Sequence, residues 1–194
     1  MKGKARLDEV DKKIIFLLQK NGRATLSKIG EETNMTHVGV KRRLEKLTKE
    51  ELIEISALLN PAKLELRAAL ILADVESYPR LQEIINMFKY CPRILCLSTL
   101  SGAYNLMAII VAENIDTLES MILGACAIRN QRGIRRSNIQ IVESFSYPIY
   151  LPIRLVAEKK LNEAPCGFIC KNCERYKLNK CLGCPTTKFY KGPL

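Results

Sequence analysis

The cysteines are the residues of this chain whose type and spacing could do the most chemistry. Five of the eight cysteines fall within residues 166–184, and four of those five form two Cys-x2-Cys pairs, Cys170 with Cys173 and Cys181 with Cys184. Two intervening residues let both sulfurs reach one metal centre, so repeated pairs of this spacing are typical of tetrahedral thiolate sites. The expected metal ligands are therefore these four cysteines together with Cys166.

Zinc is the expected ion, and an iron–sulfur cluster is the alternative, because thiolates hold both. Either centre needs only four of the five cysteines, and the sequence leaves open which four. Disulfide bonds are a further alternative if the organism is a hyperthermophile, since intracellular disulfides persist in such organisms. The other three cysteines, Cys91, Cys96 and Cys126, lie in apolar runs, and we expect them to be buried, inert thiols.

A second motif lies near the start of the chain, where residues 26–53 have the pattern of a helix-turn-helix. Thr36 can cap the second helix, and Val40, Leu44 and Leu47 then recur at helical spacing as one apolar stripe. Basic side chains lie away from that stripe. A helix with a narrow buried face and a basic outer face suits the major groove of DNA, and the plainer alternative is a solvated amphipathic helix in a small bundle.

The start and the outer face of this second helix supply the expected contacts to DNA. Lys41 and Arg42 are the candidates for base edges, because their side chains pair well with the acceptors of guanine. Thr36 and His37, at the helix start, can reach phosphate oxygens. Arg43 points back toward the apolar stripe, where it could bind phosphate or an acidic neighbour. The full expected set is Thr36, His37, Val38, Gly39, Lys41, Arg42 and Arg43.

The charge distribution agrees with a polyanionic partner at the front of the chain. The formal net charge is +11, and residues 1–55 carry 13 Lys and Arg against nine Asp and Glu. Residues 151–194 carry nine against three, whereas residues 56–150 are close to balanced. Such an excess of positive charge favours double-stranded DNA. The polar start and the lack of a long apolar span argue against a signal peptide or a membrane partner, so we expect a cytoplasmic protein.

Hydrophobic periodicity predicts an α+β fold. A helix capped by Asp8 precedes the helix-turn-helix, which we expect to be of the winged type. Beyond residue 68 the apolar pattern gives the order β-α-β-β-α-β, a ferredoxin-like arrangement whose sheet keeps one face free of helices. A bare face of this kind indicates dimerisation. The expected parts are a DNA-binding domain at 1–53, a linker strand at 54–67, the βαββαβ domain at 68–150 and a small metal-bound, cysteine-rich tail at 151–194.

Residues 7–147 resemble the Lrp/AsnC family of transcriptional regulators. The resemblance depends on the block THVGVKRRLEKL at 36–47, on the turn Asn60-Pro61 and on the loop Gly102, Ala103, Tyr104 and Asn105, which is similar to the Gly-x-Tyr-Asp turn of that family. It implies sequence-specific DNA binding by a homodimer that can assemble to an octamer. It also implies an amino-acid or other small-molecule effector bound at the loop 102–105.

Three positions depart from the family pattern. Asn105 stands where aspartate is common, which removes a charge that could hold an ammonium group. A different effector, or none, is therefore the open alternative. Glu51 stands where the recognition helix tends to end with glycine. Gly39 lies inside that helix, where glycine costs about 1 kcal/mol relative to alanine but lets the backbone approach a base.

Two other functions compete with the regulator. Siroheme decarboxylases are similar in architecture, but a histidine of their second domain is expected to meet the haem iron. The only histidine of this chain is His37, in the expected recognition helix, so we expect no enzyme activity. The other competitor is an architectural protein that binds DNA with little sequence preference, for which a flat affinity across random sequences would be typical.

Overall fold

The computed structural model describes residues 6–193 and divides the chain into two compact units, Met1–Ala57 and Leu58–Leu194. Each unit has its own hydrophobic core. Within the described residues, no helix is both long and apolar enough to cross a membrane.

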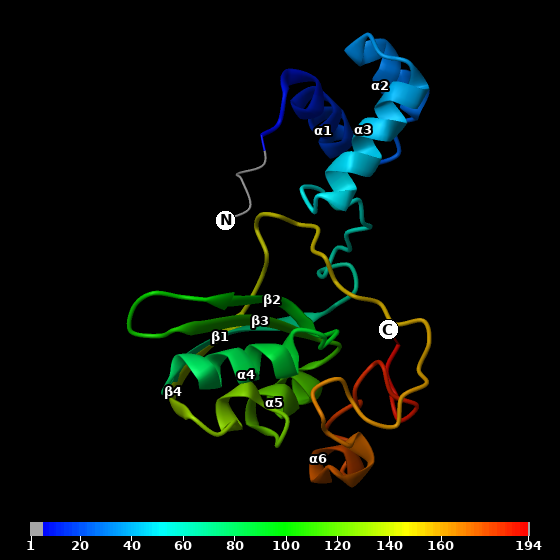
Figure 1. Ribbon diagram of the computed structural model, residues 1–194. Helices are drawn as coiled ribbons and strands as arrows, with labels where there is room; N and C mark the ends of the chain where they lie inside the picture. Colours follow the sequence, from blue (N-terminus) through cyan, green and yellow to red (C-terminus); the bar gives the residue numbers. More distant parts are fainter. Residues whose placement is uncertain (1–5, 194) are drawn as a thin grey trace. The chain divides into compact units, whose positions relative to one another are not determined.

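The first unit is a bundle of three helices, α1 (Glu9–Lys20), α2 (Leu26–Thr33) and α3 (His37–Lys49) (Figure 1). Each helix begins at a side-chain cap: Asp8 accepts a hydrogen bond from the Asp11 backbone, Thr25 from that of Lys28, and Thr36 from that of Gly39. Such caps satisfy N–H groups that have no partner within the helix. The capped starts predicted at Asp8 and Thr36 are therefore confirmed.

The core of this unit joins one residue from each helix. Ile14, Ile29 and Val40 are each at most 1% exposed and pack together. The turn between α2 and α3 is tight, because Asn34 takes a left-handed backbone with φ of +53° and the Met35 amide donates to the Gly30 carbonyl. A Cβ atom at Gly30 would lie 2.5 Å from the Met35 carbonyl oxygen, so this close approach requires glycine.

The segment after α3 differs from the prediction. Residues 6–57 hold helices and no strand, so the winged variant expected from the sequence does not form in this part of the chain. Residues 54–66, expected to form a linker strand, contain no strand: they hold turns at 61–65 and an isolated antiparallel bridge between Leu59 and Leu151. The reason is that no strand of the described residues pairs with the apolar run before Asn60, so no β-ladder forms.

The second unit contains the predicted βαββαβ order. Its elements are β1 (Arg67–Val75), α4 (Tyr78–Phe88), β2 (Ile94–Thr99), β3 (Leu106–Ala112), α5 (Ile115–Leu123), a 3-10 turn η1 (Ile128–Asn130) and β4 (Ile134–Val142). The strands form one antiparallel sheet in the order β2-β3-β1-β4, with Ile71 of β1 opposite Ala108 of β3 and Ile139 of β4. The ferredoxin-like prediction is confirmed.

Helices α4 and α5 cover the same face of the sheet (Figure 1). On that face Ile71, Ile84, Ile110 and Leu118 are at most 1% exposed and form the centre of the core. Leu70 and Leu72 alternate with these core positions along β1, and Met107 and Ile109 do so along β3; all four are only half-buried. The opposite face of the sheet therefore carries an apolar patch on β1 and β3, beside Asn138 and Gln140 of β4, and is not covered by α4 or α5.

The cysteine-rich tail belongs to the same compact unit as the sheet, although the sequence suggested a part of its own. It contains a 3-10 turn η2 (Cys170–Asn172) and a short helix α6 (Glu174–Lys177). Its contacts run to α5: the Arg175 guanidinium donates to Ser120 Oγ at 2.6 Å, and the Leu182 amide donates to Thr117 Oγ1 at 3.3 Å. The tail therefore gains its core by packing on the βαββαβ unit rather than by burying one of its own.

Candidate functional site

The outer face of α3 exposes most of the residues predicted to contact DNA. Thr36, His37, Val38, Lys41 and Arg42 are all exposed, and the Val38 side chain is 61% exposed. The opposite side of the helix holds the buried Val40 and Leu47. This division of the helix into a buried and an exposed face is the one predicted from the sequence.

The two basic residues of this face differ in their neighbours. Lys41 lies 3.8 Å from the Glu45 carboxylate one helical turn later, and both side chains are well exposed. Arg42 makes no ion pair or hydrogen bond with any residue in the range 6–193. An exposed ion pair of this length contributes little, so both cations can bind phosphate or a base edge.

Arg43 has a structural role in place of the predicted DNA contact. Its Nη1 lies 2.6 Å from a carboxylate oxygen of Asp8 and 2.7 Å from one of Asp11, both at the start of α1. The Asp11 backbone N–H and then the Arg43 guanidinium lower the pKa of Asp8 below its ordinary value. The acidic-neighbour alternative for Arg43 therefore describes the structure, because the guanidinium ties α3 to the cap of α1.

Gly39 also has an internal reason for its lack of a side chain. A Cβ atom there would lie 2.9 Å from the terminal methyl of Met35, which packs against the core of the first unit. The glycine therefore gives room to Met35, whereas the sequence alone suggested room for the close approach of a base.

The loop predicted to bind an effector is exposed over Gly102 and Ala103. The Arg136 guanidinium lies 5.2 Å from the centre of the Tyr104 ring and donates to the Ala103 carbonyl oxygen at 2.9 Å. Asn105 has a different role from the one expected. Its amide accepts from the Val75 N–H and donates to the Val75 carbonyl, each at 2.8 Å, so it fixes the end of β1.

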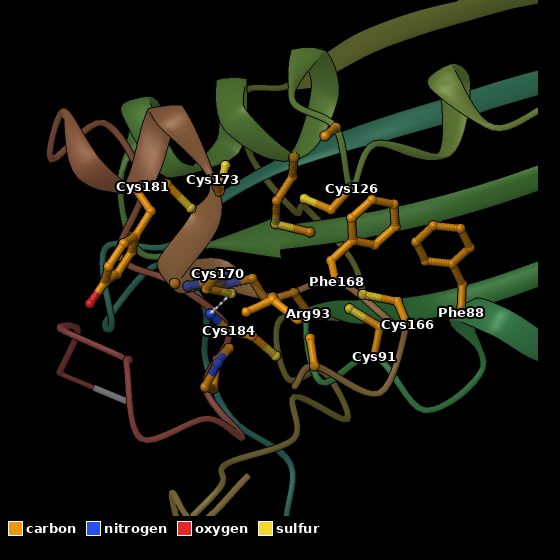
Figure 2. Close-up of a pocket in the computed structure, with 18 of the residues that line it drawn as sticks. Phe88, Cys91, Arg93, Cys126, Cys166, Phe168, Cys170, Cys173, Cys181 and Cys184 are labelled. Atoms are coloured by element: carbon orange, nitrogen blue, oxygen red, sulfur yellow. Dashed lines mark hydrogen bonds between the residues drawn. The ribbon is translucent and has the colours of Figure 1, made fainter. Parts of the chain in front are cut away.

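The five tail cysteines all line one cavity of about 410 Å³ between the tail and the helical side of the sheet (Figure 2). Two cysteines of the βαββαβ unit, Cys91 and Cys126, line the same cavity. Both were predicted to be inert core thiols. Nothing in their local sequence marks them as part of a site, because the contact that brings them together with the tail spans at least 40 residues of chain. Cys96, on β2, is not among the lining residues.

The sulfurs are distributed around the cavity wall. Figure 2 shows Cys173 and Cys181 at one end, Cys91 and Cys166 at the other, and Cys170 and Cys184 between them. The Cys170 sulfur accepts a hydrogen bond from the Cys184 backbone N–H at 3.2 Å. Within residues 6–193, no three Cys, His, Asp or Glu side chains converge closely enough to hold a single metal ion. The predicted zinc site is therefore not formed around one point.

Burial governs the acid–base state of these thiols. It raises the pKa of Cys91 and of Cys126 to about 12 and that of Cys166 to about 11. Burial also raises the pKa of Cys170. A thiol with such a pKa is neutral at pH 7, so any metal centre would form here with release of protons.

Comparison with known proteins identifies the first unit. A family model for the AsnC-type helix-turn-helix domain matches residues 7–48. The chain is 30% identical over 118 residues to the HTH-type transcriptional regulator FL11 of Pyrococcus abyssi, covering 60% of this chain and 78% of that protein. It is 26% identical over 140 residues to the HTH-type transcriptional regulator LysM of Saccharolobus solfataricus, covering 72% of this chain and 96% of that one.

A solved structure shows the same fold beyond the helix-turn-helix. Escherichia coli AsnC superposes with a TM-score of 0.62 at 16% identity, over 73% of this chain and 95% of that one. These relatives are regulators of transcription rather than enzymes. With a capped recognition helix on a three-helix bundle, a ferredoxin-like sheet and a relative of this identity, the chain belongs to the Lrp/AsnC family of DNA-binding transcriptional regulators.

Proposed function

We propose that this regulator recognises a specific operator in cytoplasmic DNA through the exposed face of α3. Arg42 and Lys41 contact base edges, Thr36 and His37 contact phosphate, and Val38 packs against a thymine methyl group. The observation that carries the proposal is the exposure of all five side chains on one capped helix whose other face is buried. Arg43 is not part of the set, because two carboxylates already bind it.

Selection from a random DNA library tests this proposal with the full chain. Specific sites should emerge that bind about a thousandfold or more tightly than random duplex at physiological salt. A flat affinity for all sequences, combined with a steep salt dependence, would overturn it and would favour the architectural alternative.

We propose further that two copies pair through the uncovered face of the sheet. Leu70, Leu72, Met107 and Ile109 form an apolar patch on two adjacent strands, and the central positions of β1 and β3 place it in the middle of the sheet. The same apolar patch on a second copy of the chain can pack against it, as a two-fold symmetric dimer requires. Assembly of such dimers to an octamer remains a prediction from the family resemblance. Sedimentation analysis of the full chain shows whether it forms dimers and whether these dimers assemble to octamers.

We also propose a small-molecule effector at the loop 102–105. A regulator of Neisseria meningitidis with this fold has been solved in complex with L-methionine, with a TM-score of 0.61 at 22% identity. The Arg136 guanidinium beside Tyr104 already pairs with Asp74 at 3.3 Å, but its side chain is 59% exposed, so a ligand carboxylate can still reach it. The Asn105 amide is already hydrogen-bonded to Val75. Titration of the full chain with each of the common amino acids should give a saturable thermal shift for at least one. No shift with any of them would overturn this part of the proposal.

A further inference from the structure

The cysteine-lined cavity is the feature of the second unit that DNA recognition leaves unexplained. Its wall combines sulfurs from two parts of the chain that the sequence had kept separate. The tail contributes Cys166 and the two Cys-x2-Cys pairs, whereas the segments that follow α4 and α5 contribute Cys91 and Cys126. Such a concentration of thiols is the environment that soft metal centres require.

We propose that this cavity binds a four-iron, four-sulfur cluster whose ligands are Cys170, Cys173, Cys181 and Cys184. The remaining sulfurs of Cys91, Cys126 and Cys166 belong to the wall on the side of the sheet. The cluster lies between the tail and the βαββαβ unit and joins the two.

The backbone favours these four cysteines. Cys170 begins the 3-10 turn η2 and Cys173 directly follows it, and Gly183, between Cys181 and Cys184, has a φ of +81°. A Cβ atom at Gly183 would lie 3.1 Å from the Phe189 carbonyl oxygen and 3.2 Å from the Tyr176 ring, so the turn needs glycine. The N–H of Cys184 already donates to the Cys170 sulfur, the kind of hydrogen bond that stabilises a thiolate bound to a cluster.

The spread of the sulfurs favours a cluster over a single zinc ion. A zinc–sulfur bond is about 2.3 Å long, so four thiolates on one ion lie within about 4.6 Å of one another. Here no three candidate ligands of the described chain converge on one point, and the lining encloses about 410 Å³. A core of several iron and sulfide ions fills such a space and holds its four thiolates apart.

The rest of the wall suits a cluster shielded from water. Phe88, Ile94, Ile110 and Phe168 line the cavity with apolar surface. Arg93, also in the lining, is buried and makes a two-pronged ion pair with Glu113, at 2.8 and 3.1 Å. The contacts from Arg175 and Leu182 to α5 hold the tail, and with it both Cys-x2-Cys pairs, against this wall before any metal binds.

Metal and sulfide analysis of the full chain, purified without oxygen and reconstituted with ferrous iron and sulfide, tests the proposal. We expect about four iron and four acid-labile sulfide per chain, with the broad visible absorption of a cluster. A colourless protein that holds one zinc and no sulfide would overturn it, and so would a protein that takes up no metal.

Single substitutions test the choice of ligands. Cys173→Ser and Cys181→Ser should each lose most of the bound iron, whereas the matched control Cys96→Ser, on β2 outside the cavity, should keep it. Circular dichroism of each variant shows that the helices and the sheet persist. Full iron content in Cys173→Ser and Cys181→Ser would overturn the assignment, and because the readout is metal content, it is independent of operator binding.

Discussion

Two adjacent arginines of the recognition helix show how a single step along the chain changes the role of a residue. Arg42 is exposed and without an ionic partner in the described residues, whereas Arg43 is bound by Asp8 and Asp11. Consecutive residues on a helix point about 100° apart, so one side chain faces solvent and the next reaches the neighbouring helix. The basic run therefore divides into Arg42, the proposed DNA contact, and Arg43, which links α3 to α1.

Arg42→Ala should weaken binding to a selected operator without destabilising the protein. Loss of one base contact costs about 1–3 kcal/mol, which is roughly a 5- to 150-fold loss of affinity, and it relaxes the preference at one base pair. Fluorescence anisotropy with the operator and its single-base variants measures both effects. Arg129→Ala, an exposed arginine of η1 in the other unit, is the control. An unchanged base preference in Arg42→Ala would contradict the assignment.

Arg43→Met should instead lower stability. The substitution leaves the largely buried Asp11 carboxylate without its guanidinium, at a cost of about 1 kcal/mol after allowance for solvent around Arg43. The difference should depend on pH. The pKa of Asp8 is lowered in the folded protein, first by the Asp11 backbone N–H and then by Arg43. The contact between Arg43 and Asp8 therefore contributes above the ordinary value of 3.8 and loses its contribution as the pH falls through the lowered pKa.

Urea unfolding of Arg43→Met and of the parent chain at pH 7 and below pH 3 checks this prediction. The two midpoints should differ at the higher pH and approach each other at the lower one. A difference that stays constant with pH would mean that packing of the arginine stem, rather than its charge, links α1 and α3.

Helices and strands were the elements that the sequence predicted best, because their signals are local. Asp8 and Thr36 mark helix starts within a few residues of the hydrogen bonds they make. What the sequence missed depends on distant partners. Asn105 binds Val75 from 30 residues away, and Arg43 binds Asp8 across 35 residues. Cys126 lines the same cavity as Cys166 of the tail, 40 residues later. No periodicity encodes such contacts, since they arise only when the elements pack.

The end of α3 provides a test at the level of the element. Glu51 has a φ of +55°, the left-handed conformation that ends many helices and favours glycine there. The Glu51 and Leu52 amides donate to the Thr48 and Leu47 carbonyls, so this conformation completes the helix end. It is also the position at which the family tends to have glycine.

Glu51→Gly should stabilise the first unit. Relief of the left-handed penalty for a residue with a side chain contributes about 1–2 kcal/mol, and the greater freedom of glycine in the unfolded chain offsets about 0.5–1 kcal/mol of it. The expected net gain is about 0.5–1 kcal/mol in the free energy of unfolding. Glu50→Gly, one residue earlier at a φ of −80°, is the matched control and should destabilise. A gain in the control and not in Glu51→Gly would contradict the explanation.

In the whole molecule, the two faces of the central sheet differ in what covers them. One face carries α4 and α5 and, at its end, the cysteine-lined cavity; the other presents the apolar patch of Leu70, Leu72, Met107 and Ile109. A pair of chains joined at this patch would carry two copies of α3, which gives a two-fold symmetric reader for two half-sites. Dimerisation and operator affinity should therefore change together.

Leu72→Glu tests this coupling. A carboxylate in the centre of the patch loses its hydration on pairing, so we expect the free energy of dimerisation to weaken by about 1.4 kcal/mol or more. The dissociation constant then rises at least about tenfold, so the dimer should already dissociate at protein concentrations at least about tenfold higher than for the parent chain. Because a monomer brings only one recognition helix, operator affinity should fall by at least the same factor. Leu178→Glu, at a leucine that is 61% exposed beside α6, introduces the same charge outside the sheet and should change neither quantity. Sedimentation velocity and anisotropy on the same samples give both constants. A Leu72→Glu protein that stays dimeric would place the contact between copies on another surface, whereas a monomer with undiminished affinity would show that one α3 suffices for recognition.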